Sequence, residues 1–183
     1  NRALSDAEIQ ALYDGGAVPP PPPIDGFTTI GTLEGSTYYL SDTELSWPDA
    51  KAAAEQEGGH LATITSQDES DLLSSYTVNQ NTRAWIGLTD RETEGDFQWV
   101  TGEELTFTNW GTGEPNDMEG EDGVEIRSNG TPGKWNDHGL ELTKRFFLET
   151  PSATVPLSGQ VTSSASGEPV VGAEVSVASL DRS

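Results

Sequence analysis

The chain has 183 residues, a formal net charge of −22 and no cysteine. This acidity argues against nucleic acid and anionic membranes as partners, because their phosphates would be repelled, and it fits cation binding or simple solubility. The lack of cysteine excludes disulfides and zinc–thiolate sites, and no segment approaches the roughly 20 apolar residues of a membrane-spanning helix.

The first 23 residues are predicted to precede the main domain. Asn1–Gly16 has a short helical pattern in which Ser5–Glu8 forms a capping box, but so few residues cannot fold alone. Residues 1–18 resemble the closing segment of a LamG-type, concanavalin-like domain. The proline run at 19–23 predicts a stiff, extended linker.

Residues 24–151 carry the signals of a globular domain. Trp47-Pro48-Asp49 opens an alanine-rich helix that runs towards Glu57 and stops at Gly58-Gly59. Ser66–Glu69 is a capping box for a second helix through Leu72, Leu73 and Tyr76. Strands are predicted at Thr37–Leu40, Leu61–Ile64, Ala84–Leu88, Phe97–Val100, Val124–Ile126, Gly133–Trp135 and Arg145–Glu149.

Residues 154–183 are rich in Val, Ser and Gly and predict two strands on either side of a turn at Gly167-Glu168-Pro169. This segment resembles the opening of a carboxypeptidase-regulatory-like β-sandwich module without its remaining strands. The three-part organisation predicts that the chain belongs to a large, multi-domain surface or secreted protein.

A stretch of few apolar residues, from Thr101 to Gly123, predicts a long surface loop. It contains Glu114-Pro115-Asn116 and the acidic pair Glu121 and Asp122, and Trp135-Asn136-Asp137 follows. All these groups are oxygen donors, which suit Ca²⁺ better than zinc or copper. Glu-Pro-Asn alone is an ordinary turn; the downstream motif and the upstream carboxylates Asp90 and Glu94 make a calcium site the stronger interpretation.

Several motifs in one order resemble the C-type lectin family over roughly residues 27–150. They are Trp47 with its helix, Gly58–Ile64, Trp85–Leu88, Trp110, Glu114–Asn116 and Trp135–Asp137. The resemblance implies an α+β fold with two helices, mixed β-sheets and a long calcium-binding loop.

The resemblance also implies two calcium sites that share this loop. The first site, which also binds sugar hydroxyls, is matched by Glu114, Asn116, Glu121, Asn136 and Asp137. The second is matched by Asp90, Glu94, Asp117 and Asp122, with the Glu121 backbone. The Glu114-Pro115 bond is expected to be cis. Met118 and His138, which flank the first site in the sequence, are candidate sugar contacts, and a solvated loop histidine is the alternative for His138.

The family's two usual disulfides would fall at Ala54 with Leu148 and at Gly123 with Leu140. Packing is expected to replace both bridges, and their absence indicates a bacterial version of the fold. The five tryptophans are interpreted mainly as core residues, and His60 as structural.

The predicted function is calcium-dependent binding of glycans, such as a cell-surface polysaccharide, by an adhesion module of an extracellular bacterial protein. The expected sugars are of the mannose, glucose or fucose type, and the fragment itself is expected to be monomeric. The alternative is a protein- or ice-binding module in which calcium is only structural. An enzyme is disfavoured, because the chain lacks a Gly-x-Ser-x-Gly elbow and neither histidine has a catalytic motif around it.

Overall fold

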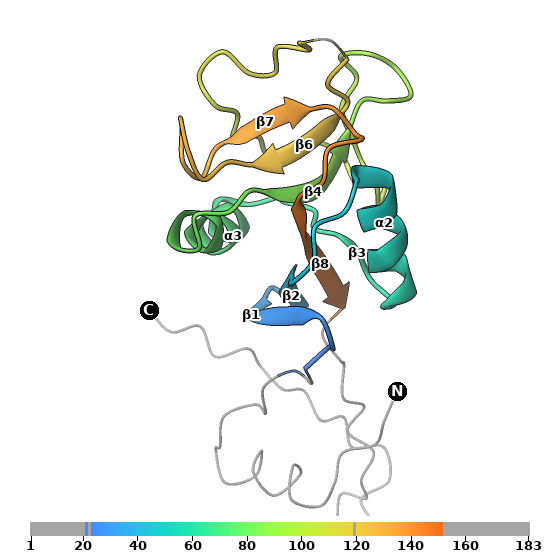
Figure 1. Cartoon of the computed structure of the whole chain (residues 1–183), viewed down its shortest axis with the longest axis vertical. Coiled ribbons are helices and arrows are strands. Elements are labelled where there is room, and N and C mark those ends of the chain that lie inside the picture. Colours follow the sequence, from blue (N-terminus) through green and yellow to red (C-terminus); the bar gives the residue numbers. More distant parts are fainter. Residues whose placement is uncertain (1–20, 22, 119, 152–183) are drawn as a thin grey trace, which may run out of the picture.

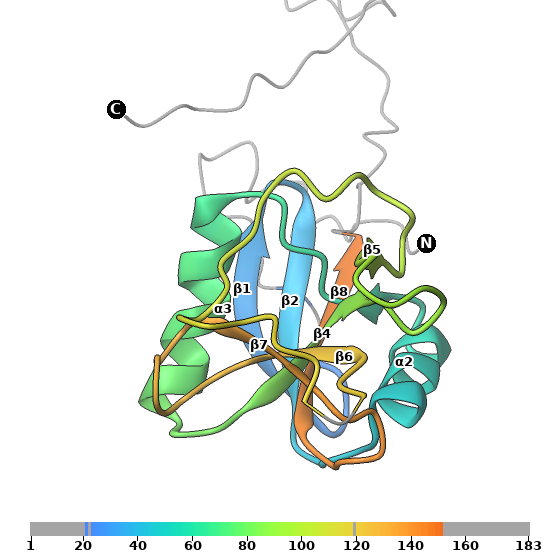
Figure 2. The ribbon, with the colours of Figure 1, turned by 90° about the horizontal axis from the view of Figure 1, so that it is seen from above.

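The computed structural model describes residues 21, 23–118 and 120–151, so the predictions for residues 1–18 and 154–183 lie outside the described residues. Two helices, α2 (Trp47–Gln56) and α3 (Gln67–Asn79), lie on opposite sides of the described domain (Figures 1 and 2). The strands are β1 (Phe27–Leu33), β2 (Ser36–Ser41), β3 (His60–Leu61), β4 (Ala84–Thr89), β5 (Gln98–Trp99), β6 (Gly123–Ile126), β7 (Trp135–His138) and β8 (Arg145–Pro151). Neither described helix is long and apolar enough to cross a membrane.

The strands form a mixed sheet in the order β1-β2-β8-β4-β6-β7. Every pairing is antiparallel except that of β4 with β8, which is parallel. Strand β4 lies between β8 and β6, which explains its continuous apolar sequence: Ala84 to Leu88 are buried on both faces. The β6–β7 hairpin and the long loop lie at the end of the domain opposite β1 (Figure 1).

Both helices begin as the sequence predicts. Ser46 caps α2 by accepting the Asp49 N–H, and Pro48 occupies the first turn, where its missing N–H costs no hydrogen bond. Helix α3 begins with the predicted capping box between Ser66 and Glu69. These local signals suffice because helix ends are set by groups within a few residues of one another.

The core consists of two apolar clusters that contain four of the five tryptophans. Trp99 and Trp135 are buried in one cluster and Trp47 and Trp85 in the other, while Trp110 is half-buried against the first. The expected replacement of disulfides by packing is confirmed. Ala54 and Leu148 are buried in the same cluster, and a side chain on Gly123 would meet Leu140.

Three sequence predictions for the strands need correction, and one strand, β1, was not predicted. The strand predicted at Leu61–Ile64 is the shorter β3, which begins one residue earlier, and the strand predicted at Phe97–Val100 shortens to β5. The final hairpin strand, expected at Gly133–Trp135, is instead β7. Its polar residues Asn136 and Asp137 are typical of a loop, yet both are buried. Burial is tolerated because their side chains form hydrogen bonds within the domain.

Candidate metal centre

The base of the long loop is attached to β7. Trp110 forms a parallel β-bridge with Trp135, and the Gly111 N–H donates to the Trp135 carbonyl over 2.8 Å. The Trp110 ring packs edge-on against Phe97 and Trp135, at centroid distances of 4.9 and 5.8 Å. These contacts place the residues after Gly111 beside the end of β7.

Asp137 joins the two polar motifs of the loop region. Its side chain is fully buried, and its carboxylate accepts the backbone N–H groups of Asn116 (2.9 Å) and Asp117 (2.7 Å). Asp117 has a φ of 44°, a left-handed conformation that Asp tolerates better than most residues. The Glu-Pro-Asn and Trp-Asn-Asp motifs are therefore in direct contact, although Asn116 and Asp137 are 21 positions apart.

Glu114 and Asn116 flank Pro115, and the Glu114–Pro115 bond is cis, as predicted. The Asn116 amide donates to Oε2 of Glu114. Arg127, which the sequence did not suggest, donates to Oε1 of Glu114 over 2.8 Å. A cation of the protein itself thus faces the carboxylate that would bind calcium.

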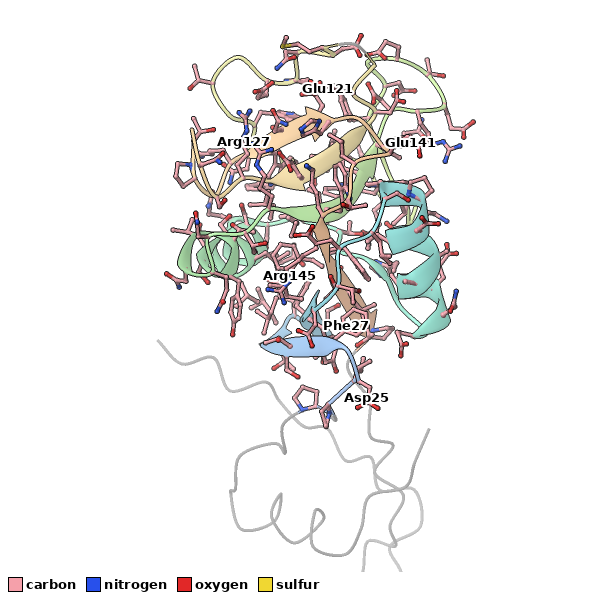
Figure 3. The ribbon with its side chains drawn as sticks, in the orientation of Figure 1. Asp25, Phe27, Glu121, Arg127, Glu141 and Arg145 are labelled. Carbon is pink, nitrogen blue, oxygen red and sulfur yellow. The ribbon has the colours of Figure 1, made fainter. Side chains whose placement is uncertain are left out.

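Glu121 lies at the end of the loop, above the β6–β7 hairpin (Figure 3), and its Oε1 lies 3.1 Å from Nδ1 of His138. Burial raises the pKa of Glu121, and the negative charges of Asp137, Glu114 and Glu125 raise it further. The hydrogen bond from the Met118 N–H lowers this pKa but does not outweigh them. The pKa of His138 is lowered to about 4, first by burial and then by nearby cations, so its contact with Glu121 is not an ion pair at neutral pH.

Met118 is the most exposed large apolar residue of the described chain, with 68% of its surface accessible. Its N–H donates to the side chains of Asn116 (3.1 Å) and Glu121 (3.2 Å), so the residue stands at the rim of the predicted first site. An exposed thioether there can pack against an apolar surface of a bound molecule.

Asn136 contacts a buried carboxylate that sequence analysis missed. Its Nδ2 donates to the Asp137 carbonyl (2.5 Å) and to Oε1 of Glu125 (3.3 Å). Glu125 is fully buried and lies 3.1 Å from both Arg83 Nη1 and Lys144 Nζ. In the sequence, Glu125 has the pattern of an exposed polar position in a half-buried strand. Its burial and its contact with Asn136 become visible only in the structure.

The predicted second site gathers four carboxylates. Asp90 is buried; its Oδ2 accepts the Gly95 N–H (2.9 Å), whereas its Oδ1 has no hydrogen-bond partner. The Asp122 carbonyl accepts from the Asp90 N–H and the Thr89 hydroxyl, which holds Asp122 beside Asp90. Desolvation, followed by the charges of Asp90, Asp117 and Asp122, raises the pKa of Glu94. These carboxylates are therefore close enough to repel one another.

The donor chemistry suits calcium at both predicted sites, since every predicted ligand supplies oxygen and the buried Asp90 Oδ1 lacks a hydrogen-bond partner. The arrangement is not yet a finished coordination shell. Within residues 23–118 and 120–151, no three His, Cys, Asp or Glu side chains converge closely enough to hold an ion. Glu114 in particular faces Arg127, and it would have to turn to join the other predicted ligands.

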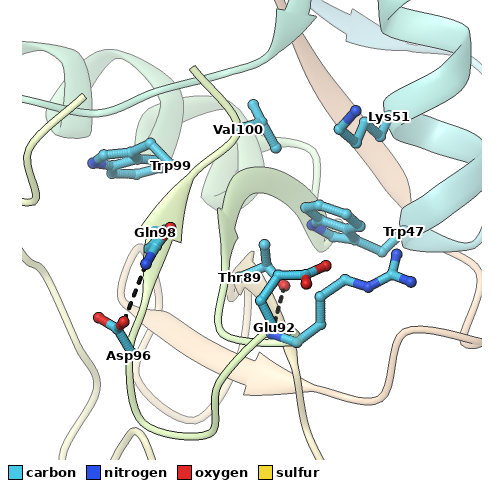
Figure 4. A pocket seen from close by; sticks show the side chains of 9 residues that line it. Trp47, Lys51, Thr89, Glu92, Asp96, Gln98, Trp99 and Val100 are labelled. Atoms are coloured by element: carbon cyan, nitrogen blue, oxygen red, sulfur yellow. Dashed lines mark hydrogen bonds between the residues drawn. The ribbon is translucent and has the colours of Figure 1, made fainter. Parts of the chain in front are cut away.

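A separate hollow of about 360 Å³ lies between α2 and the β4–β5 turn (Figure 4). Trp47, Trp99 and Val100 supply its apolar surface, while Lys51, Arg91, Glu92 and Asp96 supply opposite charges. None of the predicted calcium ligands lines it. The hollow is therefore distinct from the candidate metal centre.

Comparison with known proteins identifies the class that this fold and loop define. The chain matches the Lectin C-type domain family over residues 43–146, more than half of its length, and it belongs to that family. The family consists of recognition modules rather than enzymes. Among curated relatives, the chain is 35% identical over 128 residues to Lectin BRA-3 of Megabalanus rosa, covering 69% of this chain and 78% of that protein.

Three further matches differ in sequence identity and in how much of the relative they cover. The chain is 33% identical to CD209 antigen-like protein 2 of Macaca mulatta, over 75% of this chain but only 54% of that protein. It matches the mouse scavenger receptor C-type lectin carbohydrate-recognition domain with a TM-score of 0.63 and 30% identity, covering 72% and 98% of the two chains. A calcium-independent type II antifreeze protein shares the fold, with a TM-score of 0.62 and 21% identity, over 71% and 95%.

Proposed function

We propose that this domain binds carbohydrate through Ca²⁺ at the tip of the long loop. The observation that carries the proposal is the buried Asp137 carboxylate, which holds the Asn116 and Asp117 backbone and so brings two oxygen-rich motifs together. The proposed first ion binds Glu114, Asn116, Glu121, Asn136 and Asp137. The proposed second ion binds Asp90, Glu94, Asp117 and Asp122.

Bound Ca²⁺ accepts more oxygen ligands than these side chains supply, so it can coordinate two neighbouring hydroxyls of a sugar directly. The protein side chains form hydrogen bonds with the same two sugar hydroxyls. Glu114 accepts from one hydroxyl, and the Asn116 amide donates to the other. Met118, exposed at the rim, packs on the sugar ring, and the neutral His138 lies beside Glu121.

This donor and acceptor asymmetry favours mannose, glucose, fucose or N-acetylglucosamine over galactose. The double substitution Glu114→Gln with Asn116→Asp reverses the asymmetry at unchanged net charge. We expect the double variant to rank galactose above mannose in a competition assay. An unchanged sugar ranking would show that these hydrogen bonds do not set selectivity.

A glycan array probed in Ca²⁺, in Mg²⁺ and in EDTA tests the proposal. We expect binding in Ca²⁺ only, because Mg²⁺ demands a strict octahedral geometry that this flexible oxygen set fills poorly. Affinity for one monosaccharide should be weak, on the order of millimolar, since a single sugar offers few contacts. Glycan binding that persists in excess EDTA would refute the calcium-dependent mechanism.

A second candidate function is protein or ice binding with calcium in a structural role only. The contact between Glu114 and Arg127 favours it, because the carboxylate is engaged within the protein. The same array, combined with thermal unfolding in Ca²⁺ and in EDTA, separates the two functions: a domain that Ca²⁺ stabilises but that binds no glycan supports the second. In either case we propose an extracellular module of a larger bacterial protein, with a cell-surface polysaccharide as partner in the first case.

A further inference from the structure

A buried charge cluster lies directly beneath the proposed calcium site. Glu125 on β6 is the cross-strand partner of Asn136 on β7, and directly opposed residues project to the same face of a sheet. The Glu125 carboxylate is fully buried and lies 3.1 Å from Arg83 and from Lys144. The Lys144 ammonium also lies over the Trp85 ring, 4.9 Å from its centroid.

The cluster carries a net positive charge, which is unusual in so acidic a chain. Arg83 and Lys144 against one Glu125 leave a charge of +1. Two of the nine Lys and Arg residues of the chain thus share a single carboxylate. Without Glu125, the buried Lys144 and the partly exposed Arg83 would lose their shared carboxylate beside the place where Ca²⁺ must bind.

Glu125 also determines how the Asn136 amide is oriented. A carboxylate only accepts hydrogen bonds, so the contact with Glu125 Oε1 must come from Nδ2. The same Nδ2 donates to the Asp137 carbonyl, whereas Oδ1 accepts no hydrogen bond among the described residues. The amide oxygen, the atom suited to calcium, is therefore the one left available.

We propose that Glu125 is a positioning residue for the calcium site. It fixes the oxygen of Asn136 as a ligand and neutralises cations that would otherwise oppose the ion. This inference rests on the proposed function, since it assigns a role in calcium binding. It goes beyond the predicted ligand sets, because Glu125 belongs to neither of them.

The test compares Glu125→Gln with Arg83→Gln, which removes one charge of the opposite sign from the same ion pair. By titration calorimetry we expect Glu125→Gln to weaken Ca²⁺ binding about 10- to 100-fold, the usual effect of losing a group that orients a ligand. Arg83→Gln should bind Ca²⁺ as tightly as the wild type or more tightly. If Glu125 merely filled space, the isosteric Glu125→Gln would bind Ca²⁺ as the wild type does; if the ion pair only supported the fold, both variants would weaken binding alike. Either result would overturn the inference.

A second readout does not depend on calcium. In EDTA, the side-chain amide protons of Asn136 should exchange with water more slowly in the wild type than in Glu125→Gln, as measured by NMR. Equal exchange rates would overturn the inference whether or not the wild type binds Ca²⁺. A wild type that binds no Ca²⁺ but shows the expected difference in exchange would instead contradict the proposed function alone.

Folding of the variants is checked by circular dichroism before either measurement. If Glu125→Gln does not fold, the charge-balanced double variant Glu125→Gln with Arg83→Gln replaces it. That variant should show faster exchange of the Asn136 amide protons than the wild type and bind Ca²⁺ about tenfold more weakly, because a neutral glutamine oxygen accepts a weaker hydrogen bond than a carboxylate. Retention of both wild-type properties would refute the positioning role.

Discussion

Restoring one of the missing disulfides should stabilise the domain where the loop rejoins the sheet. The bridge usual in related lectins corresponds to Gly123 and Leu140. A Cβ atom built on Gly123 lies 2.9 Å from the Leu140 side chain and 3.2 Å from Trp47. Gly123 does not need a positive φ, so cysteine is compatible with its backbone, and replacing Leu140 as well removes the closest clash.

The size of the effect follows from the loop that the bridge closes. The two positions are about 17 residues apart, and closing a loop of this length removes about 3 kcal/mol of chain entropy from the unfolded state. Exchanging the half-buried Leu140 for cysteine loses about 1 kcal/mol of apolar burial. The net gain of about 2 kcal/mol should raise the melting temperature by roughly 6–10 °C for a domain of this size.

The assay is thermal unfolding of Gly123→Cys with Leu140→Cys in EDTA, with and without a reducing agent. The oxidised protein should melt higher than the reduced one, while Gly123→Cys alone should be destabilised because its side chain meets Leu140. Equal melting temperatures in the two redox states would refute the geometric argument. The pair Ala54→Cys with Leu148→Cys, in the second core cluster, is a matched comparison. It closes a longer loop and should remove about 4–5 kcal/mol of chain entropy from the unfolded state.

Two further predictions concern calcium and pH. Calcium at a hundredfold excess over Kd should stabilise the domain by about 2.7 kcal/mol. Backbone hydrogen exchange should then slow within residues 112–122 but not at Gly111. Equal exchange across the loop with and without Ca²⁺ would contradict this prediction. Burial tends to raise the pKa of Glu69, but hydrogen bonds from Tyr38, Thr65 and Ser66 outweigh burial and lower it. Its contribution is therefore fully present above the ordinary unfolded value of about 4.3 and is lost as pH falls through the lower folded value. Glu69→Gln should be less stable than the wild type at pH 7, and the gap measured by urea unfolding should narrow below about pH 4; a gap that stays constant with pH would exclude this role.

The sequence predicts the two described helices well, for a physical reason. Ser46, Pro48 and the Ser66–Glu69 capping box act over a few residues, so their effect is visible locally. Strand boundaries depend on partners elsewhere in the chain. Among the described residues, strand β1 pairs only with β2 and has mixed exposure along its length, so its sequence lacks the alternation that would identify it.

The residues that support the site are the hardest to predict. Glu125 and Arg127 occupy positions on and just after β6 where charged residues usually face solvent, and their meaning depends on Asn136 and Glu114 across the hairpin. Arg83 lies just before β4, far from both motifs in the sequence. Buried charges pair with residues that are close in space but distant in the sequence, so the pattern along one strand does not predict the pairing.

No disulfide pins the long loop, so packing, hydrogen bonds or a bound cation must order it. The described contacts divide that loop into two parts. At its base, Phe107 and Trp110 pack edge-on against Trp135, and Gly111 is hydrogen-bonded to β7, so this part needs no metal. Beyond Gly111, the segment is acidic, and contacts with Asp137, Arg127 and His138 hold it against its own repulsion. A bound cation should therefore stabilise the acidic segment beyond Gly111 more than the base of the loop, and this segment is also where a ligand would bind.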